Sequence, residues 1–446
     1  MKRQLYFILA FSALLASCSK ILDVNPVASV SNDISLKDST GVERAIIGSY
    51  SALQYVGTYG RNLAIVSDLA ADNLVWTGTT QDYGQIQNKP IPADNAVIDG
   101  MWSAAYEGIN RVNNILYKLP SIDYKSENGK NGVTGEALFL RALLYFNLGS
   151  YFGGVPLRLQ PTIDLSNIDL EKSSLTDIYN SSISDLESAV ELLPNANITG
   201  RATKNSAMAL LARIYLAHFQ LSGETSSANK AIVASGTLLS NSSLSLTPVY
   251  GDLFEPAITS SESLFEVVYD IQNFNRLAQY YYSRDLNGRY EVAPSAGLIA
   301  AYEANDSRFE TSIGFDEKNT AYGSKYNDVA GGTDRVYVLR LAEMYLIRAE
   351  ALAYTNGEIT AIQADINAVR NRAGLIDTEA NDYPSLKLAI ENERRLEFAF
   401  EGHRWQDLVR TKRAVEILGI IQSYTLFPIP LSEMQTNKKM IQNLNY

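Results

Sequence analysis

One segment near the C-terminus concentrates the residue types that hydrolytic enzymes use. Residues 391–408 contain four glutamates, one aspartate, three arginines and one histidine. A glycosidase needs two carboxylates on either side of the bond that it cleaves, so this segment could supply an acid and a base. The alternative is mutual neutralisation, because Glu391 and Arg395 are spaced i,i+4 and Arg394 and Glu397 are spaced i,i+3, as in helical ion pairs. We favour this alternative, an ion-pair network that locks two helices together.

The sequence contains no other motif for catalysis or metal binding. It lacks a glycine-rich phosphate loop, a GxSxG elbow, an HExxH helix and an acidic calcium loop. The chain has one cysteine and two histidines, His218 and His403, which exclude a disulfide framework and argue against a Cys/His metal site. We therefore expect no metal, no cofactor and no enzymatic activity.

Aromatic residues are the other candidates for ligand contact, since the chain has 27 tyrosines. A sugar ring packs its axial C–H groups on an aromatic face, while its hydroxyl groups need polar partners. Trp76 follows Asn73 on a predicted loop, and Phe274, Tyr281 and Tyr282 form a second cluster. Adjacent tyrosines in an extended segment point to opposite sides, so we expect Trp76 and one of the two tyrosines to form the platform. Three arginines flank the second cluster: Arg276, Arg284 and Arg289.

Helices must position these residues, because helical periodicity dominates the chain. Apolar residues make up 46% of the sequence, enough for a large core. They recur at helical spacing in these stretches: 42–55, 101–119, 136–151, 175–193, 206–220, 228–239, 339–354, 359–373, 384–400 and 404–418. Trp102 and Trp405 fall within them and are expected in the core. Short polar turns join several pairs, one with Gly357 expected in the left-handed conformation.

These patterns predict a mainly helical, all-α fold. The paired helices are similar to tetratricopeptide units, although their spacing is too irregular for a strict repeat. Residues 240–338 are rich in Tyr, Ser, Gly and Asn and include a β-like run at 264–269. We expect this region to form loops and short strands on the helical scaffold, where ligand contacts are most often found.

The first eighteen residues are typical of a bacterial lipoprotein leader. Lys2 and Arg3 precede an apolar run, 5–15, that is too short to span a bilayer. The run ends in LASC, which matches a lipobox whose cysteine is Cys18; an ordinary secretory leader is the less favoured alternative. We expect a signal peptide (1–17), a lipidated tether (18–39) and a helical ligand-binding domain (40–446), anchored to the membrane through acyl chains.

The net charge argues against nucleic acid as a partner. The chain has 49 acidic and 38 basic residues, for a formal charge of −11. A protein that binds phosphate backbones needs a basic patch, and no Lys/Arg-rich run occurs in this sequence.

Several runs together resemble the SusD/RagB family of nutrient-binding outer-membrane lipoproteins. The start of the expected mature chain reads CSKILDVNP, and a central signature reads EALFLRALLYF followed by YFGGVPL. Later runs read RLAEMYLIRAEA, RRLEFAFEGHRWQDLVR and FPIP. They follow the family's order over essentially the whole chain.

The resemblance implies a fold of tetratricopeptide-like helix pairs in one domain. It also implies a non-enzymatic role in capturing ligands at the cell surface, on the outer membrane, in partnership with a TonB-dependent transporter of the SusC type. The ligands of the family are usually oligosaccharides and in some members peptides. A glycoside hydrolase that uses the charged segment, and a helical scaffold that binds only proteins, are the competing hypotheses.

Overall fold

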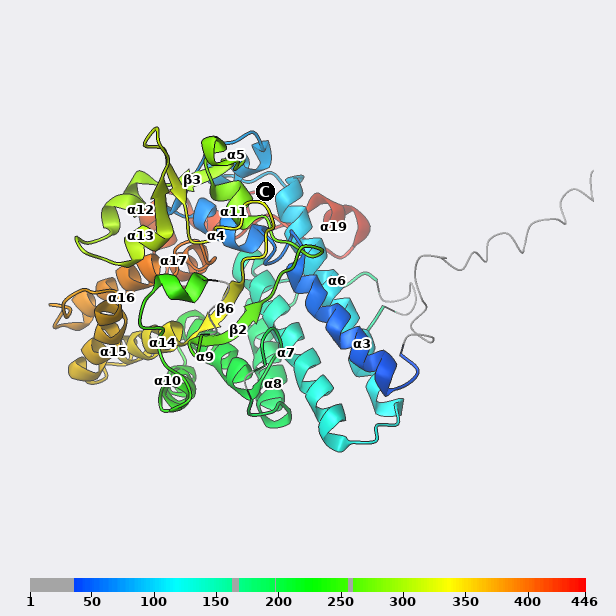
Figure 1. The fold of residues 1–446 in the computed structure, drawn as a ribbon. Helices are drawn as coiled ribbons and strands as arrows, with labels where there is room; N and C mark the ends of the chain where they lie inside the picture. Colours follow the sequence, from blue (N-terminus) through cyan, green and yellow to red (C-terminus); the bar gives the residue numbers. More distant parts are fainter. Residues whose placement is uncertain (1–35, 163–167, 197, 256–259) are drawn as a thin grey trace, which may run out of the picture.

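Helices account for most of the chain, as the apolar periodicity predicts (Figure 1). The computed structural model describes residues 36–162, 168–196, 198–255 and 260–446. The expected signal peptide, Cys18 and most of the expected tether lie outside the described residues. Leu36 is already buried in the core, and the first described helix begins at Ser39.

The longer helices are α3 (Ser39–Tyr50), α4 (Asn62–Ala70), α6 (Ala96–Lys118), α7 (Glu127–Phe152), α8 (Leu175–Leu192), α9 (Lys204–Ser222), α10 (Thr225–Leu239), α14 (Leu341–Tyr354), α15 (Ile359–Arg372) and α16 (Tyr383–Glu397). The shorter ones are α5 (Gln81–Gln87), α11 (Leu277–Tyr281), α12 (Ala296–Ala301), α13 (Arg308–Ser312), α17 (Arg404–Arg410), α18 (Ala414–Leu418) and α19 (Leu431–Thr436). The strands are β1 (Leu74–Trp76), β2 (Ser263–Val267), β3 (Val292–Pro294), β4 (Ile313–Phe315), β5 (Ala321–Gly323) and β6 (Val336–Arg340).

Successive helices pack on one another, as in tetratricopeptide arrays. Helix α6 packs on α7, α7 on α8, α8 on α9, α9 on α10, α10 on α14, α14 on α15, and α15 on α16 (Figure 1). Polar side chains fix where several of these helices begin, because they satisfy the first free backbone N–H groups. Asn95 accepts from two amides of α6, and Ser174, Thr203 and Asp382 form capping boxes at α8, α9 and α16. The predicted mainly helical fold of paired helices is confirmed.

The predicted turn between α14 and α15 is present, but its left-handed residue is not the predicted one. Asn356 has φ of +56°, whereas Gly357 does not have a positive φ. Asparagine tolerates this conformation because its short side chain can bond locally. The N–H of Gly357 instead donates to the carbonyl of Leu352, at 2.8 Å, and closes the turn.

The predicted helix over 404–418 is interrupted. Lys412 has φ of +61°, and the chain forms two short helices, α17 and α18, on either side of it. A left-handed residue cannot continue a right-handed helix, so the break is a backbone feature that apolar periodicity does not reveal. Trp405 on α17 and Trp102 on α6 are buried in the core, as predicted.

The region 240–338 contains short helices and antiparallel strand pairs on the helical scaffold. In the described residues, β1 pairs with β3, β2 with β6, and β4 with β5. The predicted β-like run becomes β2, in which Phe265 lies opposite Leu339 of β6. Trp76 lies opposite Val292 in the pair β1–β3.

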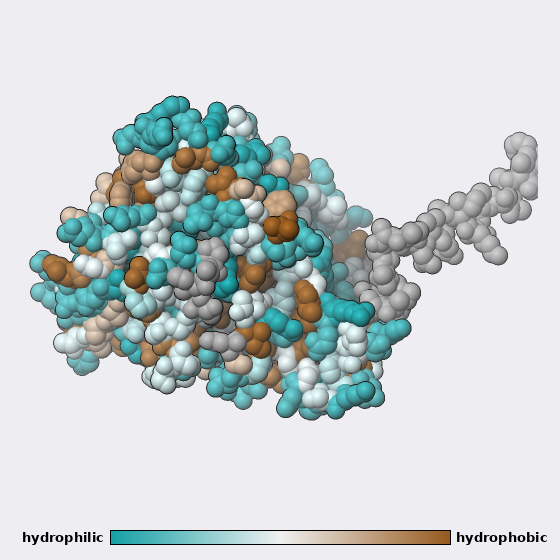
Figure 2. Space-filling model, viewed as in Figure 1, coloured by the Kyte–Doolittle hydropathy of each residue, from teal (hydrophilic) through white to brown (hydrophobic). Residues whose placement is uncertain are grey.

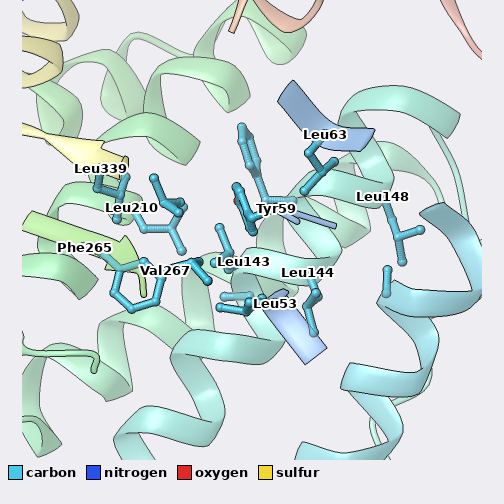
Figure 3. Close-up of a cluster of buried hydrophobic side chains, with 14 of the residues drawn as sticks. Leu53, Tyr59, Leu63, Leu143, Leu144, Leu148, Leu210, Phe265, Val267 and Leu339 are labelled. Atoms are coloured by element: carbon cyan, nitrogen blue, oxygen red, sulfur yellow. The ribbon is translucent and has the colours of Figure 1, made fainter. Parts of the chain in front are cut away.

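The main core lies where α7 and α9 meet the pair β2–β6. Figure 3 shows labelled side chains from several segments gathered there, with Tyr59 between Leu210 and Leu63. Tyr59 is 8% exposed, and its hydroxyl accepts a hydrogen bond of 3.0 Å from Asn147. A buried hydroxyl with a partner avoids the cost of an unsatisfied polar group.

The surface in Figure 2 carries its hydrophobic residues as small, separate patches within a hydrophilic surround. Among the described residues, no helix has both the length and the apolar character needed to cross a bilayer.

Candidate functional site

The charged segment near the C-terminus lies in the core, within a buried set of ion pairs. Arg340, at the end of β6, lies 2.6 Å from Glu262, 2.9 Å from Glu397 and 2.8 Å from Glu401. Arg372 on α15 also contacts Glu262 and Glu397, at 3.0 and 2.5 Å. All five side chains are at most 4% exposed. We call these five residues the central ion-pair network.

Two further cations extend the central ion-pair network. Arg308 is fully buried and contacts Asp306, Glu393 and Glu397, at 2.8, 2.5 and 3.3 Å. The ammonium group of Lys325 lies 2.9 Å from Glu401. Every buried cation here therefore has at least one carboxylate, which is the condition under which charges are tolerated in a protein interior.

The expected network is present, but its pairs differ from the predicted ones. Arg395 pairs with Asp72 at 3.0 Å, and Arg394 pairs with Asp407 at 2.8 Å, while Glu397 belongs to the central ion-pair network. Helical spacing identifies pairs on a solvated face, whereas α16 is packed against other elements on several sides. The network therefore joins segments far apart in the sequence and not merely two neighbouring helices.

The electrostatics of two of these carboxylates, Glu397 and Asp407, do not suit acid–base catalysis. Burial alone would raise the pKa of Glu397, but Arg372, Arg340 and Arg308 outweigh it and hold the pKa well below its ordinary value. Asp407 behaves in the same way: burial alone would raise its pKa, but Arg394 and Arg410 outweigh that effect and lower it. A general acid must hold a proton near neutral pH, which these groups do not.

A cavity of about 210 Å³ borders this charged region. Its walls include Phe146, Tyr179 and Ile347, and its polar residues include Glu343 and His403. Burial alone would raise the pKa of Glu343, but Arg213 and its other charged neighbours lower it to about 2. Burial lowers the pKa of His403 to about 4, so the imidazole is neutral at pH 7. Neither group is poised to transfer a proton at neutral pH.

The second candidate site lies where β1, β3 and α11 meet (Figure 1). The backbone N–H groups of Tyr290 and Glu291, just before β3, donate to the carbonyls of Tyr282 and Tyr280, at 3.1 and 3.0 Å. The N–H of Thr77, just after β1, donates to the carbonyl of Glu291 at 3.1 Å. The two aromatic segments that the sequence singled out are thus neighbours in space.

Trp76 is half-buried, with its indole resting on α5. A Cβ atom on Gly84 would lie 2.8 Å from the ring carbon Cε3, so only glycine leaves room for the ring there. The backbone N–H of Trp76 donates to Gln87 at 2.6 Å. The indole Nε1 is buried and has no hydrogen-bond partner among the described residues. The helix backbone therefore fixes the orientation of the ring and covers part of it.

Three tyrosines accompany Trp76 in this region. Tyr282 and Tyr322 are half-buried, with ring centroids 4.5 Å apart and planes tilted by 46°. Tyr290 is also half-buried, and its hydroxyl donates to the carbonyl of Ala321 at 3.0 Å. We call Trp76, Tyr282, Tyr290 and Tyr322 the aromatic face.

Two of the five predicted ligand-binding residues need correction, because Asn73 and Tyr281 are buried. Asn73 is 1% exposed; its amide oxygen accepts from Arg395 at 2.9 Å, and its amide nitrogen donates to Asp68 at 3.3 Å. Tyr281 is fully buried and packs edge-on against Phe400, with centroids 5.2 Å apart. Both side chains are enclosed in the interior and do not reach the surface.

The remaining predicted residues are accessible to different degrees. Trp76 and Tyr282 are half-buried, and Phe274 is 40% exposed, with the guanidinium of Arg276 4.2 Å from its ring centroid. The sequence did not single out Tyr290 or Tyr322. Neither residue belongs to a recognisable sequence motif. To identify them from the sequence, one would have to know that β4 and β5 pair beside the loop that contains Tyr290.

Comparisons with known proteins cover nearly the whole chain. The family model described as "Starch-binding associating with outer membrane" matches residues 21–216, and the model described as "SusD family" matches residues 318–424. SusD-like protein P38 of Formosa agariphila is 27% identical over 99% of this chain and 98% of its own.

Solved structures share the fold. A SusD superfamily protein from Bacteroides vulgatus superposes with a TM-score of 0.83 at 23% identity, over 92% of this chain and 99% of that one. A laminarin-binding SusD-like protein superposes with a TM-score of 0.78 at 25% identity, over 92% of this chain and 100% of that one.

Removing one carboxylate from the central ion-pair network should destabilise the fold. We expect Glu397→Gln to lower the free energy of unfolding by about 3–5 kcal/mol, because it leaves buried arginine charge uncompensated. Urea denaturation followed by circular dichroism measures this. The exposed residue Glu310 on α13 gives a matched control, and Glu310→Gln should change the free energy by less than about 0.5 kcal/mol. Equal stability of the two variants would contradict the structural role.

Acid should destabilise the protein through its arginine-paired carboxylates. The pKa of Glu343 is about 2 in the folded protein, against an ordinary value of 4.5, and those of Glu397 and Asp407 are also lowered. The unfolded chain therefore binds more protons between these values, so the stabilisation present above pH 4.5 is lost as the pH falls toward 2. Urea denaturation should give a clearly lower free energy of unfolding at about pH 3 than at about pH 7, and the difference should be smaller for Glu343→Gln. Equal stability of the wild-type protein at the two pH values would contradict this assignment.

Proposed function

The chain belongs to the SusD/RagB family, and from that premise we propose that it captures oligosaccharides at the outer membrane. In this proposal it passes them to a TonB-dependent transporter of the SusC type. The observation that carries the proposal is the aromatic face, whose rings come from separate segments that backbone hydrogen bonds around β1 and β3 bring together. The laminarin-binding relative, which shares this fold over its full length, supports the choice of a glycan as ligand.

The chemistry of the aromatic face suits a sugar. Half-buried rings present flat apolar surface that is already ordered, so little conformational entropy is lost when a pyranose stacks on them. Polar groups surround the rings: the hydroxyl of Thr77 donates to the carbonyl of Tyr290, and the exposed side chains of Asn287 and Arg284 lie on the loop between Tyr282 and Tyr290. Trp76 and Tyr282 are the proposed stacking residues, with Phe274 at a more exposed position.

We assign no catalytic role to the chain. A hydrolase would require a carboxyl group that holds a proton at neutral pH and a second that is ionised, both facing a substrate. The carboxylates of the charged segment are instead paired with arginines or a lysine: Glu391, Glu393, Glu397, Glu401 and Asp407.

The proposal includes a lipid anchor at Cys18. Acyl chains on this residue would hold the protein at the outer membrane, with the chain before α3 as the tether. The expected division into a signal peptide (1–17), a tether (18–39) and a helical domain (40–446) belongs to the same proposal. The matching family model, whose description refers to association with the outer membrane, supports it.

Loss of the indole should weaken glycan binding without unfolding the protein. We expect Trp76→Ala to reduce affinity about thirtyfold, which corresponds to losing about 2 kcal/mol from one central aromatic anchor. Isothermal titration with laminarin oligosaccharides and with other soluble glycans measures the affinity, and circular dichroism and thermal melting check the fold. Tyr117 on α6 is an aromatic residue that is 51% exposed and lies outside the aromatic face, so Tyr117→Ala is the matched control.

A second variant tests whether binding depends on the orientation of the Trp76 indole as well as on its presence. Gly84→Ala should displace the indole, since the new Cβ would lie 2.8 Å from it, and should also weaken binding. Full affinity in both variants, or binding of peptides and of no glycan, would overturn the assignment of the aromatic face as a glycan site.

Substitution of the lipobox cysteine should release the protein from membranes. Two acyl chains or more bind a bilayer stably, whereas a chain without them has no such anchor. Cys18→Ala should therefore incorporate no palmitate analogue and should appear in the soluble fraction after cell lysis. Ser19→Ala, next to it, is the control and should remain anchored. Label retained by Cys18→Ala would show that the anchor is not at this residue.

A further inference from the structure

We propose that the aromatic face recognises acidic oligosaccharides, whose sugars carry carboxylate or sulfate groups. This inference rests on the proposed function and narrows its class of ligand. It starts from the way in which arginines are paired in this fold.

Most arginines of the described residues contact a carboxylate. Four arginines of the described residues form no ion pair with a carboxylate within 4.0 Å: Arg44, Arg61, Arg276 and Arg284. Arg44 lies on α3. The other three lie in the segments that build or border the aromatic face. Arg61 and Arg276 also lie close together, although carboxylates outnumber cations in this chain, whose net charge is −11.

Aromatic contacts hold two guanidinium groups beside the aromatic face. Those of Arg61 and Arg289 lie 4.3 and 4.9 Å from the ring centroid of Tyr280, which is 7% exposed. Arg61 also donates to the hydroxyl of Tyr280. Stacking on a fixed ring orders a guanidinium without neutralising its charge.

Arg276 lies next to this pair. Its backbone N–H donates at 2.9 Å to the carbonyl of Gly60, the residue before Arg61. Its guanidinium donates to the amide oxygen of Gln279 at 3.0 Å, a neutral partner that leaves other N–H groups free. We call Arg61, Arg276 and Arg289 the arginine cluster.

The carboxylates nearby are already engaged. Glu291 accepts from the backbone N–H groups of Thr79 and Thr80, at 3.0 and 2.9 Å, and makes one contact of 3.2 Å with Arg289. Asp285 pairs with Lys318. Four more carboxylates of this region cap turns by accepting backbone N–H groups: Asp270, Asp316, Asp328 and Asp334. Acidic groups of the protein itself therefore leave Arg61 and Arg276 without an ionic partner.

An acidic sugar would supply the missing partner. The planar fork of a guanidinium matches the oxygens of a carboxylate or a sulfate, and such charge-assisted hydrogen bonds are stronger than neutral ones. The arginine cluster and the aromatic face are built from neighbouring segments, because Tyr280, which Arg61 and Arg289 contact, lies on α11 and Tyr282 follows that helix directly. An oligosaccharide bound on the rings could therefore place an acidic substituent against the arginine cluster. A neutral glucan would stack on the rings, and the guanidinium groups would stay solvated by water.

The test compares three probes matched in length by isothermal titration: oligogalacturonides, sulfated galactan oligosaccharides and laminarin oligosaccharides. We expect at least one acidic probe to bind about tenfold tighter than laminarin oligosaccharides. Arg276→Gln should weaken binding of that acidic probe about two- to fivefold, the range for one exposed ion pair, and should leave neutral binding unchanged. Arg44→Gln removes an unpaired arginine from α3 and should change neither affinity. Arg276→Lys, which keeps the charge but loses the fork, should recover only part of the acidic binding.

The outcomes separate this inference from the proposed function. Equal or tighter binding of laminarin oligosaccharides, with loss in Trp76→Ala, would overturn the preference for acidic sugars and leave glycan capture intact. Equal effects of Arg276→Gln and Arg44→Gln on the acidic probe would also overturn it, because the arginine cluster would then act only through net charge. Binding of an acidic peptide and of no oligosaccharide would overturn both.

Discussion

The fold depends on one requirement, that charges removed from water meet opposite charges. Arg340 concentrates this requirement, since its guanidinium faces Glu262, Glu397 and Glu401 in a site that is almost fully buried. These partners come from the chain before β2, from the end of α16 and from the turn that follows α16, with Arg372 on α15 completing the set. Leaving any of them unpaired would cost several kcal/mol, so the loop region and the C-terminal helices must come together correctly for either to be stable. The central ion-pair network thereby fixes long loops on a helical scaffold that could otherwise accept several arrangements.

The same requirement reaches the aromatic face through the segment that joins α4 to β1. Asp72 pairs with Arg395 on α16 and with Arg404 on α17, at 3.0 and 2.7 Å. Four residues earlier, Asp68 accepts a hydrogen bond of 2.6 Å from the backbone N–H of Phe400, and burial raises its pKa to about 7. Trp76 follows directly on β1, so its position is set by contacts with the turn between α16 and α17. The charged segment that first suggested catalysis therefore supports the proposed ligand site, because it holds the strand that carries Trp76.

The sequence predicts features that depend on neighbouring residues better than features that depend on residues far apart in the chain. The positions of most longer helices and the core locations of Trp102 and Trp405 depend on local apolar spacing, and these were predicted correctly. The ion-pair network was also predicted, but its partners were not, because Arg395 finds Asp72 only after the two ends of the chain meet. The prediction that Asn73 and Tyr281 contact the ligand was wrong for the same reason. Their residue types suit a ligand site, but whether a side chain is buried depends on which distant segment packs over it. Periodicity likewise gave no sign of the left-handed backbone at Lys412.

Arginine has two roles in this molecule, which differ in how deeply the guanidinium group is buried. In the core, Arg340 and Arg308 are paired with carboxylates, so replacing either would strand charge and damage the fold. Beside the aromatic face, the half-buried Arg276 contacts only neutral side chains, the ring of Phe274 and the amide of Gln279, so replacing it would leave no buried carboxylate unpaired. Residues of the second kind can change without disturbing the scaffold. The physical consequence is that ligand preference can vary through the loops around β3, while the buried ion pairs keep the same helical architecture beneath them.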